Sequence, residues 1–176
     1  MAEDKPLPFA AHTQALMDSI RRAGFPPISQ QPVEMARKAY AAGVGAMAHP
    51  PVPLPRVEPF TIPGPAGDIP ARLWASTHDK DLPVFLYLHG GGFTVGSVAS
   101  HERLCRHLAH LARCAVVSVD YRLAPEWKFP TAVEDTWDSL AWLRDNAAAL
   151  KLDASRIAIG GDSAGGTLAA VTAIAA

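Results

Sequence analysis

Residues 156–171 read RIAIGGDSAGGTLAAV, in which Ser163 stands between two glycines, Gly161 and Gly165. The apolar residues before the serine predict a short strand, and the small residues after it predict a helix, so Ser163 lies at the tip of a strand-turn-helix. Glycine at 161 and 165 lets the chain turn tightly, because a side chain at either position would collide with the other arm. The turn is therefore expected to present a hydroxyl above the edge of a sheet, at the N-terminus of a helix.

The serine motif by itself allows two interpretations. In the first, Ser163 is a nucleophile. In the second, the segment is an ordinary tight turn whose serine caps the following helix, a common task for this residue. Short motifs of glycine, serine and alanine also arise by chance. A second glycine-rich stretch favours the nucleophile.

That stretch is His89-Gly90-Gly91-Gly92-Phe93, directly after the apolar run 84–88. Consecutive glycines are costly in conformational entropy, and one reason for them is that backbone N–H groups must approach a ligand closely. Acyl transfer needs such donors at the oxygen that becomes negative, and a loop of this type accompanies the serine turn in lipases and esterases. A flexible surface loop, the alternative, fits poorly beside an apolar strand. We expect hydrogen bonds to hold His89 where it shapes the loop, and we do not expect it to act as a base.

Two regions of different character are predicted along the chain. Residues 1–55 contain two amphipathic helices, at 13–23 and 32–44, followed by a proline-rich link at 49–55. Such a region is interpreted as a helical cap tethered to a main domain. The main domain is predicted to span residues 56–176.

Strands and helices alternate in the predicted main domain, after a hairpin that opens it. In chain order the predicted elements are strands 57–62, 69–74 and 84–88, helix 100–112, strand 115–119, helix 131–146, strand 157–159 and the helix after Ser163. An antiparallel start followed by alternating strands and helices indicates the α/β class, with a mostly parallel sheet.

Apolar spacing also predicts which side of each helix faces the core. One side of the first helix of the main domain carries Leu104, His107, Leu108 and Leu111, and core spacing on the second helix is shown by Val133, Trp137, Leu140 and Ala141. Three tryptophans are interpreted as packing residues of the core and lid, and two cysteines as buried thiols: Trp127, Trp137 and Trp142, and Cys105 and Cys114.

Composition argues against several classes of function. The chain of 176 residues is 49% hydrophobic and 19% charged, as in ordinary globular domains, and its net charge of −1 offers no general attraction for nucleic acid or an anionic membrane. No window of the sequence resembles a membrane helix, and the N-terminal residues lack the pattern of a secretory signal. We therefore expect a cytoplasmic protein that neither binds nucleic acid nor spans a membrane.

Four ordered motifs together resemble the hormone-sensitive-lipase-like branch of carboxylesterases, bacterial family IV. They lie between residues 82 and 168 and read His89-Gly90-Gly91-Gly92-Phe93, Asp120-Tyr121-Arg122-Leu123-Ala124-Pro125-Glu126, Phe129-Pro130-Thr131-Ala132-Val133-Glu134-Asp135 and Gly161-Asp162-Ser163-Ala164-Gly165-Gly166. The resemblance implies an α/β-hydrolase fold with Ser163 as the nucleophile. It also implies an oxyanion hole formed by the backbone N–H groups of Gly91, Gly92 and Ala164, and a lid that includes the N-terminal helices. Neither a cofactor nor a metal is implied.

The substrate implied by the resemblance is a small-molecule acyl ester of short to medium chain length. The family's acid and histidine lie beyond the nucleophile helix, and the 13 residues after Ser163 contain no Asp, Glu or His. We therefore expect the chain to be the N-terminal part of the fold, to need the C-terminal remainder of that fold as its partner, and to have at most trace esterase activity as residues 1–176 alone. Two alternatives stay open: a non-catalytic, receptor-like ligand-binding homologue, and an inactive fragment.

Other residues that could carry chemistry have simpler interpretations. Asp120 ends a strand, but Arg122 is expected to pair with Glu126 in a structural turn at this point. No metal site is predicted, because Cys or carboxylate partners at ligand spacing are lacking around three histidines that we expect to be exposed or half-buried, His101, His107 and His110.

Overall fold

The computed structural model of the chain describes residues 9–24, 26–47 and 49–176. Internal contacts divide the chain into two compact units, Met1–Pro32 and Val33–Ala176. The first unit contains α1 (Ala11–Ala23) and a short 3₁₀ helix (Ile28–Gln30), and the second begins with α2 (Val33–Met47). Both predicted N-terminal helices are thus present. The predicted domain boundary between residues 55 and 56 stays a prediction, since α2 groups with the sheet.

A five-stranded mixed sheet forms the centre of the second unit, in the spatial order β1-β2-β4-β3-β5. The strands are β1 (Arg56–Ile62), β2 (Ile69–Ala75), β3 (Leu82–Leu88), β4 (Ala115–Val119) and β5 (Leu152–Gly161). β1 and β2 form the predicted hairpin, and β2 also pairs with β4 in the antiparallel direction. β3 runs parallel to both β4 and β5. The antiparallel start and the parallel continuation predicted from the sequence are both confirmed.

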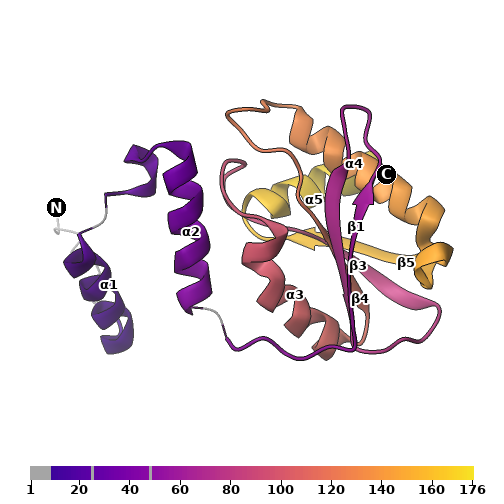
Figure 1. Cartoon of the computed structure of the whole chain (residues 1–176), viewed down its shortest axis with the longest axis horizontal. Helices are drawn as coiled ribbons and strands as arrows, with labels where there is room; N and C mark the ends of the chain where they lie inside the picture. The colour runs from indigo at the N-terminus through magenta and orange to yellow at the C-terminus, as the bar shows by residue number, and fades with distance from the viewer. Residues whose placement is uncertain (1–8, 25, 48) are drawn as a thin grey trace, which may run out of the picture. The chain divides into compact units, whose positions relative to one another are not determined.

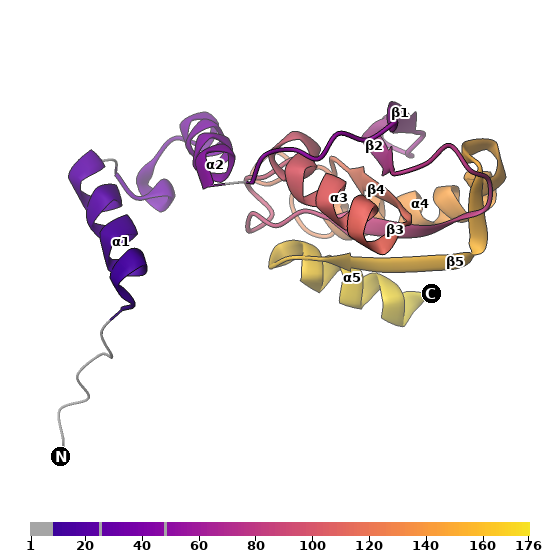
Figure 2. The same cartoon turned by 90° about the horizontal axis from the view of Figure 1, so that it is seen from below.

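Helices cover both faces of this sheet, and they are α3 (Val98–Ala112), α4 (Thr131–Asn146), a 3₁₀ turn (Ala147–Leu150) and α5 (Ala164–Ala175). Figure 1 shows α3 and α4 on opposite sides of the strands, and Figure 2 shows α5 running back along β5. Alternate residues of β3 serve the two faces: Leu86 and Leu88 join the core under α4 and α5, whereas Phe85 and Tyr87 pack with α3. Burial on both faces of the sheet explains why residues 84–88 of β3 form a continuous apolar run.

The buried face of α3 differs from the predicted one. Val98, Cys105 and Ala109 are buried, whereas Leu104 and Leu111 are 44% and 76% exposed. The prediction for these two leucines is wrong because their row lies one residue, or about 100°, round the helix from the row that meets the sheet. Small side chains in that second row let α3 approach β2 and β4 closely.

The buried face of α4 is more polar than predicted. Leu140 packs partly against the core as predicted, but Trp137 is 40% exposed, so this part of the prediction is wrong. Thr136 and Ser139 are fully buried instead, and each hydroxyl donates a hydrogen bond to the main-chain carbonyl four residues earlier, at 2.8 and 2.6 Å. These hydrogen bonds within the helix allow the two hydroxyls to be buried without a partner on another element. The spacing of hydrophobic residues does not predict such buried polar positions.

The predicted ion pair between Arg122 and Glu126 is also wrong. Arg122 binds Asp135 of α4 instead: its Nε lies 2.9 Å and its backbone N–H 2.8 Å from Asp135 Oδ2, and the carboxylate is 1% exposed. Glu126 pairs with Arg37 of α2 at 2.7 Å. The Arg122 guanidinium also lies 4.7 Å above the Trp127 ring. Arg122 therefore ties the segment after β4 to α4.

Removal of this buried carboxylate is expected to destabilise the fold. Asp135→Ala should lower the free energy of unfolding by about 3 kcal/mol, because it leaves a mostly buried guanidinium without its partner. Asp145→Ala is the matched control, since the pair between Arg144 and Asp145 is 65% and 63% exposed and should contribute less than about 1 kcal/mol. Urea denaturation measures both. Equal effects of the two substitutions would contradict the assignment.

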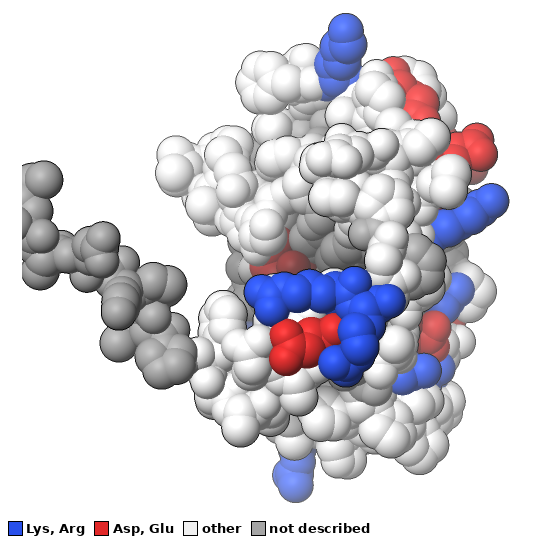
Figure 3. Space-filling model, turned by 90° about the vertical axis from the view of Figure 1, so that its left-hand side faces the viewer, with Lys and Arg blue, Asp and Glu red and all other residues white. Residues whose placement is uncertain are grey.

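Charged side chains are sparse and mixed in sign on one face of the protein (Figure 3). The face drawn in Figure 3 is mostly uncharged, and blue and red side chains lie next to one another on it. Within the described ranges, no helix is long and apolar enough to cross a membrane. The same ranges contain no group of three His, Cys, Asp or Glu side chains placed to hold a metal ion.

Candidate active site

The register of two parallel strands brings the two glycine-rich motifs together. Leu88, the last residue of β3, lies opposite Gly161, the last residue of β5. The carboxyl ends of parallel strands meet at one edge of a sheet, which is where ligands bind in α/β folds. The loop that begins at His89 and the turn that holds Ser163 therefore leave the sheet side by side.

Ser163 sits in a strained backbone conformation, with φ 51° and ψ −119°. Such a conformation costs a non-glycine residue about 1–3 kcal/mol and is typical of functional turns. The flanking glycines are required mainly by the neighbouring strand: a Cβ atom would lie 2.2 Å from Leu88 O at Gly161 and 1.9 Å from it at Gly165. A Cβ at Gly161 would also lie 2.7 Å from the carbonyl carbon of Gly165, which is the predicted clash between the two arms.

The Ser163 hydroxyl makes no hydrogen bond within the described part of the chain, and its side chain does not cap α5. The interpretation of this serine as a helix cap therefore gains no support. Ser163 is exposed, and α5 begins immediately after it at Ala164. An unpartnered hydroxyl at a helix N-terminus on a strained turn is available for chemistry.

Backbone N–H groups without a hydrogen-bond acceptor among the described residues lie on the glycine loop and at the start of α5. Gly91 and Gly92 have φ values of 129° and 58°, in the region that favours glycine. No described residue accepts a hydrogen bond from the N–H of Gly91, Gly92 or Ala164. Ala164 is the first residue of its helix, where an N–H has no partner inside the helix. The residues of the predicted oxyanion hole thus carry unused donors on the two adjoining turns.

His89 is held inside the fold, below the glycine loop. Its side chain is fully buried, its Nδ1 lies 2.9 Å from Gly90 O, and its ring stacks on Tyr121 with centroids 4.3 Å apart. The Tyr121 hydroxyl donates a hydrogen bond to His89 O at 2.6 Å. Burial lowers the pKa of His89, so the imidazole is kept neutral. These contacts agree with a residue that shapes the loop.

Asp162 is a site residue that the sequence reasoning missed. Its Oδ1 accepts hydrogen bonds from the Gly90 N–H at 2.8 Å and the Tyr87 hydroxyl at 2.5 Å, and it lies 3.6 Å from His101 Nε2. His101 is 7% exposed, so the prediction that it is exposed or half-buried is wrong. One signal was available in the sequence: a carboxylate stands among small residues directly before the serine.

The remaining polar candidates have structural contacts. Asp120 Oδ1 accepts a hydrogen bond from the Val98 N–H at 2.7 Å, which places Asp120 at the start of α3. His107 Nε2 lies 3.2 Å from Pro50 O, and His110 is exposed. The structural interpretation of Asp120 is therefore supported.

An arginine of α2 connects this helix to the site. Arg37 Nε donates to Thr94 O at 2.9 Å, and its guanidinium also donates to Ala124 O at 3.0 Å. Glu126 raises the pKa of Arg37 through a hydrogen bond. Because Thr94 follows the glycine loop and Ala124 follows β4, one cation joins both segments to α2.

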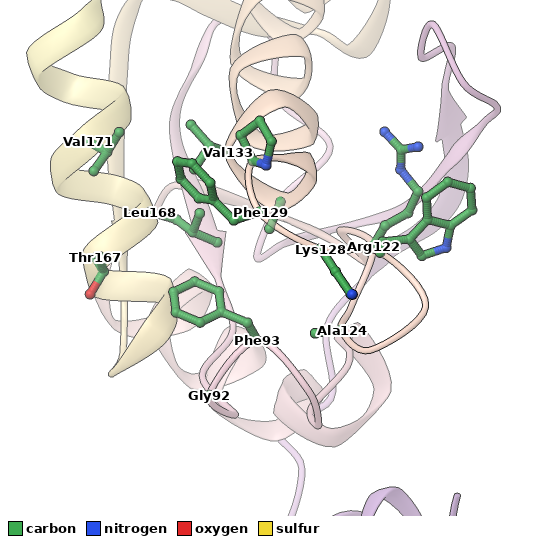
Figure 4. A pocket seen from close by; sticks show the side chains of 13 residues that line it. Gly92, Phe93, Arg122, Ala124, Lys128, Phe129, Val133, Thr167, Leu168 and Val171 are labelled. Carbon is green, nitrogen blue, oxygen red and sulfur yellow. The ribbon is translucent and has the colours of Figure 1, made fainter. Parts of the chain in front are cut away.

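A mostly apolar cavity of about 620 Å³ adjoins the glycine loop and α5. In Figure 4, Phe93, Phe129 and Leu168 approach one another from the loop, the segment before α4, and α5. Gly92 and Thr167 line its side nearest the two turns, and Lys128 extends into it. Its size falls within the range of small-molecule sites.

Comparison with known proteins places this arrangement in a family. The model of a family described as the alpha/beta hydrolase fold matches residues 85–176. Esterase LipI of Mycobacterium tuberculosis is 48% identical over 121 residues, which cover 67% of this chain and 38% of the relative. Carboxylesterase NlhH of the same species is 45% identical over 146 residues, which cover 80% of this chain and 44% of the relative.

Solved structures agree with this placement. A hyperthermophilic esterase from the archaeon Pyrobaculum calidifontis superposes with a TM-score of 0.87 at 41% identity, over 96% of this chain and 54% of that one. The chain therefore spans about half the length of the solved relative and less than half of the two mycobacterial proteins. By sequence and by fold, the chain belongs to the α/β-hydrolase family, in its hormone-sensitive-lipase-like esterase branch.

Proposed function

We propose that the full-length protein is a serine carboxylesterase that hydrolyses short- to medium-chain acyl esters through an acyl-enzyme on Ser163. The observation that carries this proposal is Ser163, which has a strained backbone and an exposed, unpartnered hydroxyl on a turn that adjoins the glycine loop. The relatives named above are esterases, and this supports ester hydrolysis as the general reaction. A receptor-like, non-catalytic role is not favoured by any of these comparisons.

In the proposed reaction, Ser163 Oγ attacks the ester carbonyl carbon as its proton passes to a base. The carbonyl oxygen becomes negative and accepts hydrogen bonds from the N–H groups of Gly91, Gly92 and Ala164. Collapse of this intermediate breaks the bond to the alcohol, which leaves with the proton, and Ser163 carries the acyl group. Water then attacks the acyl-enzyme in the same way and releases the acid.

The base and its orienting acid are assigned to polypeptide outside the described residues. No described histidine forms a hydrogen bond with Ser163 Oγ. In hydrolases with this turn, the acid and the histidine follow the serine along the chain. The relatives are about twice as long as this chain, which leaves room for both groups.

The apolar cavity is proposed to hold the acyl or alcohol chain of the ester. It shares Gly92 with the proposed oxyanion hole and Thr167 with the helix behind Ser163. Its walls carry aromatic and aliphatic side chains, which favour hydrocarbon groups over charged ones.

Covalent labelling tests the proposal. A fluorophosphonate probe added to the full-length protein should form a phosphorus–oxygen bond with Ser163 Oγ and release fluoride. Peptide mapping by mass spectrometry locates the adduct. Ser155→Ala is a matched control, because Ser155 lies on the same strand and is bound to Asp153 through both its N–H and its hydroxyl. That variant should be labelled like the wild type, and Ser163→Ala should not be labelled. An adduct that survives Ser163→Ala would contradict the assignment.

A further inference from the structure

A single carboxylate oxygen joins the two turns of the site. Asp162 Oδ1 accepts one hydrogen bond from the Gly90 N–H, at the start of the glycine loop, and one from the Tyr87 hydroxyl on β3. Gly90 and Asp162 are 72 residues apart in the chain. Three segments therefore meet at this atom, immediately before Ser163.

Gly90 provides an independent sign of the same contact. Its φ does not lie in the positive region that would require glycine. A Cβ atom at this position would, however, lie 2.0 Å from Asp162 Oδ2 and 2.8 Å from its Cγ. The close approach of the Asp162 carboxylate is thus the local reason why residue 90 carries no side chain.

The surroundings of the Tyr87 hydroxyl keep it protonated, so that it can donate a hydrogen bond to the Asp162 carboxylate. Tyr87 is 4% exposed, and burial first, then the hydrogen bond to Asp162, raises the pKa of its hydroxyl. The phenol therefore stays protonated at neutral pH. His101 Nε2 lies 3.6 Å from the same oxygen. Asp162 Oδ1 is thus held by two hydrogen-bond donors and lies near an imidazole.

We propose that Asp162 is a positioning residue that clasps the glycine loop to the serine turn. It holds Gly90, the first glycine of the loop, in place. The N–H groups of Gly91 and Gly92 can then bind the same ester carbonyl oxygen as the N–H group of Ala164. Hydrogen bonds from Val95 N–H to Gly91 O and from Ala124 N–H to Phe93 O hold the loop further along. The catalytic meaning of the clasp rests on the proposed function.

Two substitutions at Asp162 in the full-length protein separate the hydrogen bonds from the charge. Asp162→Ala should lower kcat by about 10²-fold with KM changed by less than about threefold. This result is expected when the N–H groups of the oxyanion hole are displaced from the oxygen that becomes negative. Asp162→Asn keeps an oxygen that can accept both hydrogen bonds, so its kcat should stay within about tenfold of the wild type. Asp153→Ala is the matched control, because Asp153 is a hydrogen-bonded carboxylate at the other end of β5.

Hydrogen exchange supplies a second readout that does not depend on turnover. Peptides that cover residues 89–96 should exchange faster in Asp162→Ala than in the wild type, and at the wild-type rate in Asp162→Asn and Asp153→Ala. Gly90→Ala should displace the carboxylate and reproduce both effects. In an Asp162→Ala background, Gly90→Ala should cost less than in the wild type, because the two closest contacts, Oδ2 at 2.0 Å and Cγ at 2.8 Å, are gone and only the main-chain O at 3.0 Å remains.

Each outcome decides the proposal. The clasp is rejected if Asp162→Ala matches Asp153→Ala in kcat and exchange, or if Asp162→Asn is as damaging as Asp162→Ala. It is also rejected if Gly90→Ala costs as much with Asp162 absent as with it present. If Asp162→Ala does not fold, Gly90→Ala and Asp162→Asn still give opposite expected results. If the wild type neither hydrolyses esters nor labels at Ser163, the proposed function fails, while the exchange data still decide the clasp.

Discussion

Replacement of Ser163 by alanine is expected to lower kcat of the full-length protein by about 10⁶-fold, the loss known for the nucleophile of a serine protease. The reason is that no other hydroxyl occupies the strained turn at the carboxyl end of β5. The free backbone donors would remain, so residual hydrolysis above the uncatalysed rate is expected. A p-nitrophenyl ester assay with titrated active sites measures the loss. A decrease of less than about tenfold would show that another group attacks the ester.

Glycine at position 163 should give a different result for stability. The wild-type conformation, φ 51° and ψ −119°, strains any residue with a Cβ atom, and this strain costs about 1–3 kcal/mol. Ser163→Gly relieves it at an entropic cost of about 0.5–1 kcal/mol. Ser163→Gly should therefore unfold at higher urea concentration than Ser163→Ala, although both are inactive. Equal midpoints would contradict the presence of strain.

Gly91 and Gly92 of the loop are expected to differ in their sensitivity to substitution. A Cβ at Gly91 would lie 2.0 Å from Val95 O, and the φ of 129° is unfavourable for alanine. Gly91→Ala must therefore move the loop, and kcat should fall by about 10²–10³-fold with little change in KM. At Gly92 no atom lies within 4 Å of the added Cβ, and the φ of 58° is a left-handed conformation that alanine adopts at a cost of about 1–2 kcal/mol.

Steady-state kinetics on both alanine variants test this difference. Gly92→Ala serves as the matched control for Gly91→Ala, since it adds the same methyl group one residue later and should lose less than about tenfold in kcat. A raised KM with unchanged kcat in Gly91→Ala would mean that the loop shapes only the substrate pocket. Equal losses in the two variants would show that steric clash with Val95 is not the cause.

The sequence predicted the local elements well because their causes are local. Apolar patterns placed most strands and helices of the sheet unit within two or three residues of their observed bounds, including α4 at Thr131–Asn146, but β5 begins five residues before the predicted strand 157–159. Helix faces were harder to predict. On α3 the side with the leucines was predicted to face the core, whereas the buried residues of the helix include His101, Cys105 and Ala109. Hydrophobicity ranks side chains by size, whereas close packing against a sheet can select small ones.

The serine turn and the glycine loop could be recognised from the sequence alone, because a tight strand-turn-helix around Ser163 requires small residues at positions 161 and 165. The closest steric partner of both glycines, Leu88 O on the neighbouring strand, is visible only in the folded structure. Which segments these turns contact depends on long-range packing. Leu88 lies opposite Gly161 through strand register, Asp162 binds Gly90 across 72 residues, and Arg122 binds Asp135 where the sequence suggested a nearer partner. The periodicity of apolar residues does not predict which residues far apart in the chain come into contact. A charged side chain finds its partner only when long-range packing has set which segments adjoin, and several carboxylates within reach along the chain could have served equally well.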